Sequence, residues 1–167
     1  MSLSTVELQE VIANPIDLVE RMAMGQDWPC ERRGDDELTI ELGGQWCQYK
    51  LCFAWHGELG VMQVSAALDM PVPTRRLGPV QALLALANEK LWLGHFELWS
   101  AERIPVFRHS MIFRDGNVAG PELIEDLVDV AMTECERFYP AFQFVIVGGK
   151  RPAEAIELAM LETEGEA

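Results

Sequence analysis

The 167 residues include 13 Lys and Arg against 27 Asp and Glu, which gives a formal net charge of −14. So acidic a chain repels nucleic acid and anionic membrane surfaces, because binding to either depends on clustered basic side chains. The length predicts a single domain, 1–167, that can form a core without a metal or a disulfide. Within it we expect residues 1–13 to be partly mobile and residues 162–167 to form an acidic tail.

The sequence also bears on where the protein works. No stretch is apolar over the ~20 residues that a membrane-spanning helix needs. Residues 1–10 lack the basic and apolar segments of an export signal. Four cysteines in such a chain are expected to be reduced thiols. These features predict a cytoplasmic bacterial protein with neither a nucleic-acid nor a membrane partner.

The first half of the chain predicts one helix and four strands. Asn14 and Pro15 are typical of a helix start, and Gly25 ends that helix. Alternating apolar and polar residues then predict strands that are separated by Gly-containing turns, the second of them at Gly43-Gly44. The predicted strands are residues 28–33, 37–42, 46–55 and 61–70. Prolines at positions 71 and 73 end this meander, because proline cannot continue a central strand.

The second half predicts a helix over residues 76–93, with Gly94 as its left-handed cap. Two strands, 95–101 and 105–114, follow and are joined by a turn near Arg103. The break at residues 115–117 leads into a long helix, 120–148, whose apolar residues alternate four and three apart. A short helix, 153–161, precedes the acidic tail.

Pro140 leaves two readings of the long helix open. Its ring removes one helical hydrogen bond at a cost of ~3 kcal/mol, so the helix either kinks and continues, or stops and gives way to a strand over residues 142–147. We favour the continuing helix, because the apolar stripe keeps its register across the proline. The whole pattern predicts an α+β fold: a mainly antiparallel sheet with helices packed on one face, in the order α-β-β-β-β-α-β-β-α.

The residues offer little sign of catalysis or metal binding. Cys47 and Cys52 lie an odd number of residues apart, so a regular strand points them to opposite faces and a shared metal with Cys30 and His56 is not expected. None of the four cysteines lies in a nucleophile motif. If the turn is centred on Arg103, Glu97 faces His109 across the strand pair, an arrangement that could serve a hydrolase but is more often a surface contact. We therefore predict no enzyme, no cofactor and no metal.

Two stretches suggest a family. Residues 88–99 read NEKLWLGHFELW and residues 138–156 read FYPAFQFVIVGGKRPAEAI; both resemble the YbjN family of bacterial sensory transduction regulators. The resemblance covers nearly the whole chain. It implies a fold similar to that of type III secretion chaperones, which are typically small acidic dimers that bind extended segments of partner proteins. The matching residues are apolar, Gly and Pro, so they imply an architecture and no active site.

Two functions follow as expectations. The first is a non-enzymatic interaction module, a chaperone-like or regulatory adaptor, that forms a homodimer and binds another protein through a sheet face or groove. Trp46 and Trp99 are the candidate partner surface, with core packing as the alternative for each. The second is a small-ligand sensor with a pocket between the long helix and the sheet. Five methionines are its candidate lining: Met22, Met24, Met62, Met70 and Met132.

Overall fold

The computed structural model describes residues 14–113 and 120–164, which form one six-stranded antiparallel sheet and four α-helices. The strands, in sheet order, are β1 (Cys30–Arg33), β2 (Glu37–Gly43), β3 (Gln48–His56), β4 (Val61–Ala67), β6 (Ile104–Ile112) and β5 (His95–Trp99). The helices are α2 (Pro15–Gly25), α3 (Leu77–Asn88) after the 3-10 turn η1 (Thr74–Arg76), α4 (Pro121–Ile146) and α5 (Pro152–Glu164). The predicted α+β class and element order are confirmed. The predicted mobility of residues 1–13, the break at 115–117 and the end of the acidic tail lie outside the described residues.

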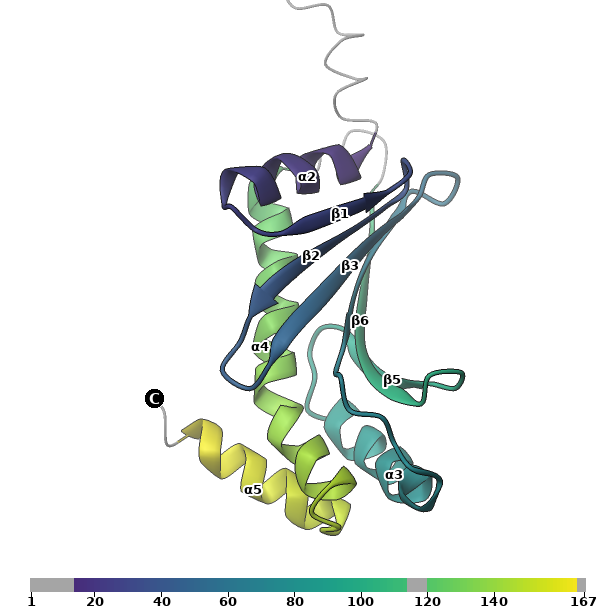
Figure 1. Cartoon of the computed structure of the whole chain (residues 1–167), viewed down its shortest axis with the longest axis vertical. Coiled ribbons are helices and arrows are strands. Elements are labelled where there is room, and N and C mark those ends of the chain that lie inside the picture. Colours follow the sequence, from purple (N-terminus) through teal and green to yellow (C-terminus); the bar gives the residue numbers. More distant parts are fainter. Residues whose placement is uncertain (1–13, 114–119, 165–167) are drawn as a thin grey trace, which may run out of the picture.

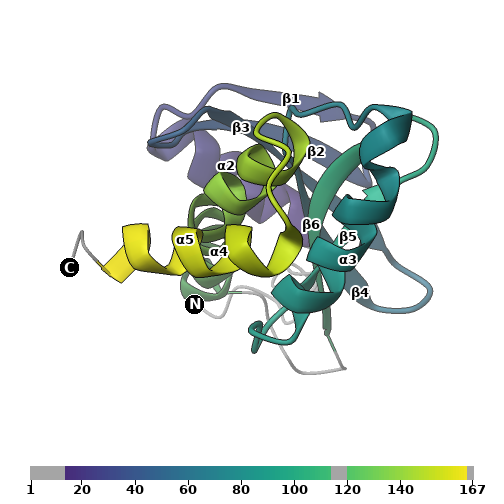
Figure 2. The ribbon, with the colours of Figure 1, turned by 90° about the horizontal axis from the view of Figure 1, so that it is seen from below.

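The helices gather on one side of the sheet, as predicted (Figures 1 and 2). Helix α2 packs against β1, β2 and β3, whereas α4 packs against β3, β4 and β6. Helix α3 contacts β5, and α5 lies on α4 and α3. The described helices leave the opposite face of the sheet uncovered, and that face carries mostly charged and small side chains. Together with Pro29 and Cys30, the following residues line a shallow hollow there: Glu31, Arg33, Glu37, Thr39, Glu41, Lys50, Cys52, Ser65, Ala67 and Trp99.

Alternation along the strands decides which side chains enter the core. In β2, for example, Leu38 and Ile40 are fully buried, and the register places them opposite the buried Phe53 and Leu51 of β3. The helix before them begins as predicted, because the Asn14 side chain accepts a hydrogen bond from the Ile16 N–H at 3.0 Å. The apolar face of the sheet and the apolar stripes of the helices thus form one core.

Helix α4 runs unbroken through Pro140, so the strand alternative for residues 142–147 is wrong for 142–146, which are helical. The apolar stripe explains why the helix tolerates the proline. Ala131, Cys135, Phe138, Phe142 and Val145 are all fully buried, on both sides of Pro140. Their burial offsets the one backbone hydrogen bond that the ring removes.

The end of α3 differs from the prediction. The helix stops at Asn88, and Gly94 is not its cap; instead Gly94 has a positive φ of 69° and its backbone lies against the Phe107 ring. The cause is the Asn88 side chain, whose carbonyl accepts from the Phe96 N–H at 2.7 Å while its amide donates to the Phe96 C=O at 3.0 Å. Asn88 thus occupies backbone groups on the free edge of β5 that another strand could otherwise pair with.

Replacing Asn88 with Ala is expected to lower the free energy of unfolding by about 1–3 kcal/mol, because two hydrogen bonds to partly buried backbone groups are lost. The opened edge should also make the protein associate at high concentration. Urea denaturation and light scattering against concentration measure the two effects. A matched change at the adjacent exposed position, Glu89→Ala, should leave both unchanged. Equal behaviour of the two variants would contradict this role for Asn88.

Candidate functional site

The β2–β3 connection is a loop where the sequence predicted the start of a strand. Strand β3 begins at Gln48, not at residue 46, because residues 44–47 turn back on themselves through a hydrogen bond from the Gly44 N–H to the Cys47 C=O at 2.9 Å. The turned loop reaches the middle of α4. It is there that the structure forms its candidate functional site.

Glu136 of α4 holds this loop in place. Its carboxylate accepts the Gln45 N–H, with both oxygens 3.1 Å from the nitrogen. The loop can come this close only because residue 44 is glycine: a Cβ there would lie 1.9 Å from a Glu136 carboxylate oxygen and 2.4 Å from the Tyr49 ring. A contact between residues 91 positions apart therefore fixes the loop on the helix.

Aromatic stacking completes the attachment. The Trp46 indole lies parallel to the Tyr139 ring, with centroids 6.3 Å apart and an interplanar angle of 4°. The Tyr139 ring also meets the buried Tyr49 ring edge to face at 6.4 Å. Burial is the main cause that raises the pKa values of both tyrosine hydroxyls further above physiological pH, at which a tyrosine is already neutral. Trp46 is thus held from one side while 37% of its surface stays exposed.

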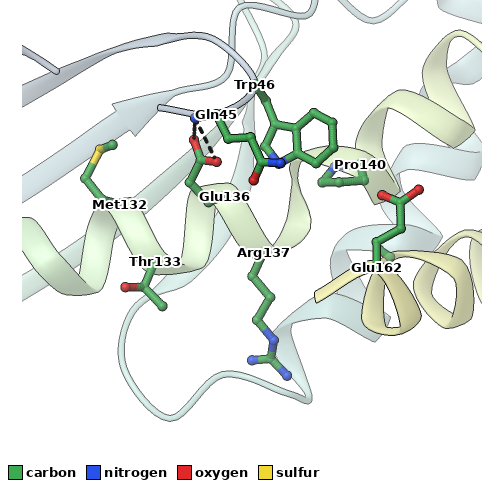
Figure 3. Close-up of a pocket in the computed structure, with 9 residues that line it drawn as sticks. Gln45, Trp46, Met132, Thr133, Glu136, Arg137, Pro140 and Glu162 are labelled. Carbon is green, nitrogen blue, oxygen red and sulfur yellow. Dashed lines mark hydrogen bonds between the residues drawn. The ribbon is translucent and has the colours of Figure 1, made fainter. Parts of the chain in front are cut away.

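The exposed side of Trp46 forms one wall of a half-open groove of about 450 Å³, which we call the Trp46 groove (Figure 3). The other walls come from α4 and α5. The lining is mostly apolar and comprises Gln45, Trp46, Met132, Thr133, Glu136, Arg137, Pro140, Ala159 and Glu162. The proline that α4 tolerates is thus part of this surface. A groove of this kind can take apolar side chains of a partner or a small molecule.

Arg137 is the one cation in that lining, and it is engaged along its own helix. Its guanidinium lies 3.5 Å from the Glu134 carboxylate and stacks over the Phe138 ring at 5.0 Å. Burial raises the pKa of Glu134, and the nearby Arg137 only partly opposes this. Glu136 and Glu162 have no basic partner of this kind among the described residues. The lining therefore combines apolar side chains with two carboxylates that no Lys or Arg of the described residues neutralises.

Trp99, the other predicted partner residue, lies elsewhere, on the uncovered face of the sheet. Its indole N–H donates to Glu97 at 3.0 Å, and Glu97 also binds the Arg108 guanidinium at 2.8 Å. Trp99 is 37% exposed, as is Trp46. The structure does not bring the two tryptophans together, because one lines the Trp46 groove and the other the hollow on the open face.

The predicted pair of Glu97 with His109 is wrong. The β5–β6 register places Glu97 opposite Val106, and His95 opposite Arg108, so the strand pair is shifted by three residues from the prediction. Glu97 and His109 therefore point to opposite faces of the sheet. The shift follows from where the chain turns: Arg103, with a positive φ of 54°, is the last turn residue and not the centre of the turn.

His109 leads to a pH prediction. Burial, and then the charge of His95, lower the pKa of His109 in the folded protein. The unfolded chain therefore binds a proton more readily, and folding stability falls as the pH drops from about 6.5 through the lowered folded-state pKa. His109→Gln should reduce this loss in urea melts between pH 7 and 5, whereas His56→Gln, at an exposed site, should keep it. An unchanged pH dependence in His109→Gln would contradict the assignment.

The cysteines do not form a site. All four are free thiols, and burial is the main cause that raises the pKa of Cys47, Cys52 and Cys135. For Cys52, 3.2 Å from a Glu37 carboxylate oxygen, the pKa rises to about 11. Thiols with raised pKa values are poor nucleophiles and poor metal ligands at neutral pH. Within residues 14–113 and 120–164, no group of three or more His, Cys, Asp or Glu side chains is placed to hold a metal ion.

The predicted methionines and the exposed Trp92 lie in different parts of the structure. Of the five methionines, Met132 lines the groove, Met62 and Met70 are in the core, Met22 packs against the core half-buried, and Met24 is 65% exposed. The sequence also gave no hint that Trp92, in the loop after α3, would be 98% exposed. The predicted helix over residues 76–93 includes Trp92, whereas α3 ends at Asn88 and leaves Trp92 in the following loop. In the part of the chain described, no helix is long and apolar enough to span a membrane.

Comparisons with known proteins address the family. The YbjN family model, described as "Putative bacterial sensory transduction regulator", matches residues 15–144. The crystal structure of YbjN from E. coli shares the fold, with a TM-score of 0.52 at 11% identity, covering 93% of this chain and 95% of that one. The crystal structure of the ExsC–ExsE complex gives a TM-score of 0.46 at 12% identity, over 83% and 94% of the two chains. No curated protein matches the sequence. Because the family model spans most of its length, this chain belongs to the YbjN family.

Proposed function

We propose that this protein is a non-enzymatic interaction module, a regulatory adaptor, and that a segment of its partner protein binds in the Trp46 groove. The observation that carries the proposal is Trp46 itself, which is fixed by the Tyr139 stack and yet keeps 37% of its surface exposed above an apolar groove. Binding energy at interfaces concentrates in tryptophans that are already held in place, because little side-chain entropy is lost on binding. The family description as a regulator is compatible with such a role.

The described residues favour binding over catalysis. The thiols of Cys47, Cys52 and Cys135 have raised pKa values, and the Glu97 carboxylate is engaged by Arg108 and Trp99 and not by His109. A catalytic site requires an activated nucleophile or a base within reach of a substrate. The groove instead presents an indole, a thioether, a proline ring and two carboxylates, groups that can contact a bound segment of another protein.

The groove is tested by filling it. Thr133→Arg puts a long side chain on an exposed position of α4 that lines the groove, and Gln81→Arg puts the same side chain on an exposed position of α3 outside it. Each variant, immobilised beside wild type, is used to capture proteins from native lysate. We expect wild type and Gln81→Arg to retain the same saturable partner and Thr133→Arg to lose it by on the order of tenfold, ~1.4 kcal/mol. Equal capture by all three would overturn the groove as the binding site.

We also propose that the protein acts in the cytoplasm as a homodimer. The four free thiols fit a reducing compartment. Exposed large apolar side chains such as Trp92 are common where copies associate. Native mass spectrometry at micromolar concentration should show the dimer mass, and a monomer alone would contradict the proposal.

A small molecule is the second candidate occupant, because the groove volume of about 450 Å³ lies within the usual range for ligand sites. Thermal-shift measurements across metabolites distinguish the two. A compound that raises the melting temperature of wild type and of Gln81→Arg, but not of Thr133→Arg, would favour the sensor.

A further inference from the structure

The negative charge of the protein is concentrated on the two helices that border the Trp46 groove. Ten acidic residues lie in them, six in α4 and four in α5, against a single basic residue, Arg137. These two helices alone carry a net nine negative charges of the formal fourteen. An apolar groove within such a field attracts positively charged segments and repels negatively charged ones.

The charged side chains that line the groove also favour a positively charged segment. Glu162 on α5 and Glu136 on α4 both line it, and neither pairs with a Lys or Arg among the described residues, because Arg137 is turned to Glu134. The Glu136 carboxylate accepts a backbone N–H, which positions it but leaves its negative charge uncompensated. A partner with cationic side chains would supply the missing positive charge.

We propose that the segment bound in the Trp46 groove is a basic amphipathic one: apolar side chains lie on Trp46, Met132 and Pro140, and flanking Lys or Arg side chains meet Glu162 and Glu136. This inference rests on the proposed function and adds the chemistry of the partner. The groove is half-open, so it admits side chains from a continuous segment without enclosing it. An acidic segment would instead place like charges against Glu162 and Glu136.

Synthetic peptides test the charge preference directly. Three fluorescein-labelled peptides of ~14 residues carry leucines at the same helical spacing, and their other positions are Lys, Glu or Gln. Anisotropy with the full-length protein should show the Lys peptide binding on the order of tenfold more tightly than the Gln peptide, with no saturable binding of the Glu peptide. Raising the salt from ~50 mM to ~300 mM should lower the affinity of the Lys peptide until it is close to that of the Gln peptide.

Two pairs of variants locate the binding. Glu162→Lys at the groove rim and Glu89→Lys on exposed surface at the end of α3 change the net charge equally. Of these two variants, only Glu162→Lys should weaken the binding of the Lys peptide several-fold. In the other pair, Thr133→Arg should weaken it by on the order of tenfold and Gln81→Arg should leave it unchanged. Equal weakening by Glu162→Lys and Glu89→Lys would mean attraction to net charge alone and would overturn the proposal.

The remaining outcomes separate this inference from the proposed function. If all three peptides bind equally and Thr133→Arg weakens each, the groove binds protein segments but the basic preference is wrong. If none of the peptides binds, the inference is overturned. In that case the capture experiment with Thr133→Arg and Gln81→Arg still decides whether the groove binds a protein.

Discussion

Replacing Phe96 with Ala is expected to lower the free energy of unfolding by about 3–5 kcal/mol, the usual cost of removing a fully packed aromatic side chain. Phe96 is 2% exposed and meets three other phenylalanines. Its ring lies 5.4 Å from that of Phe107 on β6, and 5.4 Å and 5.3 Å from those of Phe138 and Phe142 on α4. One ring on β5 thus joins the edge of the sheet to the long helix, and a cavity there would loosen both.

Urea denaturation measures this loss, and a melting temperature lower by on the order of 10 °C should accompany it in a chain of this size. The control is Trp92→Ala, which removes a larger aromatic side chain at 98% exposure and should change stability by no more than about 0.5 kcal/mol. A loss below ~1 kcal/mol in Phe96→Ala would mean that the four rings do not form a cooperative core.

The cluster also shows what the sequence could predict. Phe138 and Phe142 belong to the four-and-three spacing that predicted α4, and that spacing was strong enough to override the local effect of Pro140. The alternation of Leu38 and Ile40 with polar residues likewise placed β2 and its buried face correctly. Both patterns work because a continuous apolar face must be buried somewhere, whatever the partner element is.

Such patterns do not predict contacts between residues that are far apart in the sequence. The pair Gly43-Gly44 predicts a hairpin turn. Gly44 is required for a different reason, because Glu136 and Tyr49 approach its backbone, and no residue near position 44 in the sequence indicates this approach. The end of α3 was missed for a similar reason, since Asn88 binds the backbone of Phe96. Consequently, the element order of the fold was predictable, but the Trp46 groove was not, because it depends on where a loop meets a helix.

Gly44 gives the second large expected effect, because it couples stability to the Trp46 groove. Gly44→Ala is expected to cost about 2–4 kcal/mol, since the new methyl group must displace a Glu136 carboxylate oxygen 1.9 Å away and the buried Tyr49 ring. The neighbouring change Gly43→Ala is the control, because its methyl group meets only the end of the flexible Gln48 side chain, at 3.1 Å. It should cost no more than about 1 kcal/mol.

The same substitution should also remove the Trp46 groove. If the loop leaves Glu136, the Trp46 indole loses its stack on Tyr139, which the indole ¹⁵N–¹H signal of Trp46 would report in NMR spectra. A double-mutant cycle with Glu136→Ala identifies the cause: if the carboxylate clash dominates, the two changes together cost clearly less than the sum of their separate costs. Additive costs would instead assign the strain to Tyr49. An unshifted Trp46 signal in Gly44→Ala would show that the groove does not depend on the close approach at residue 44.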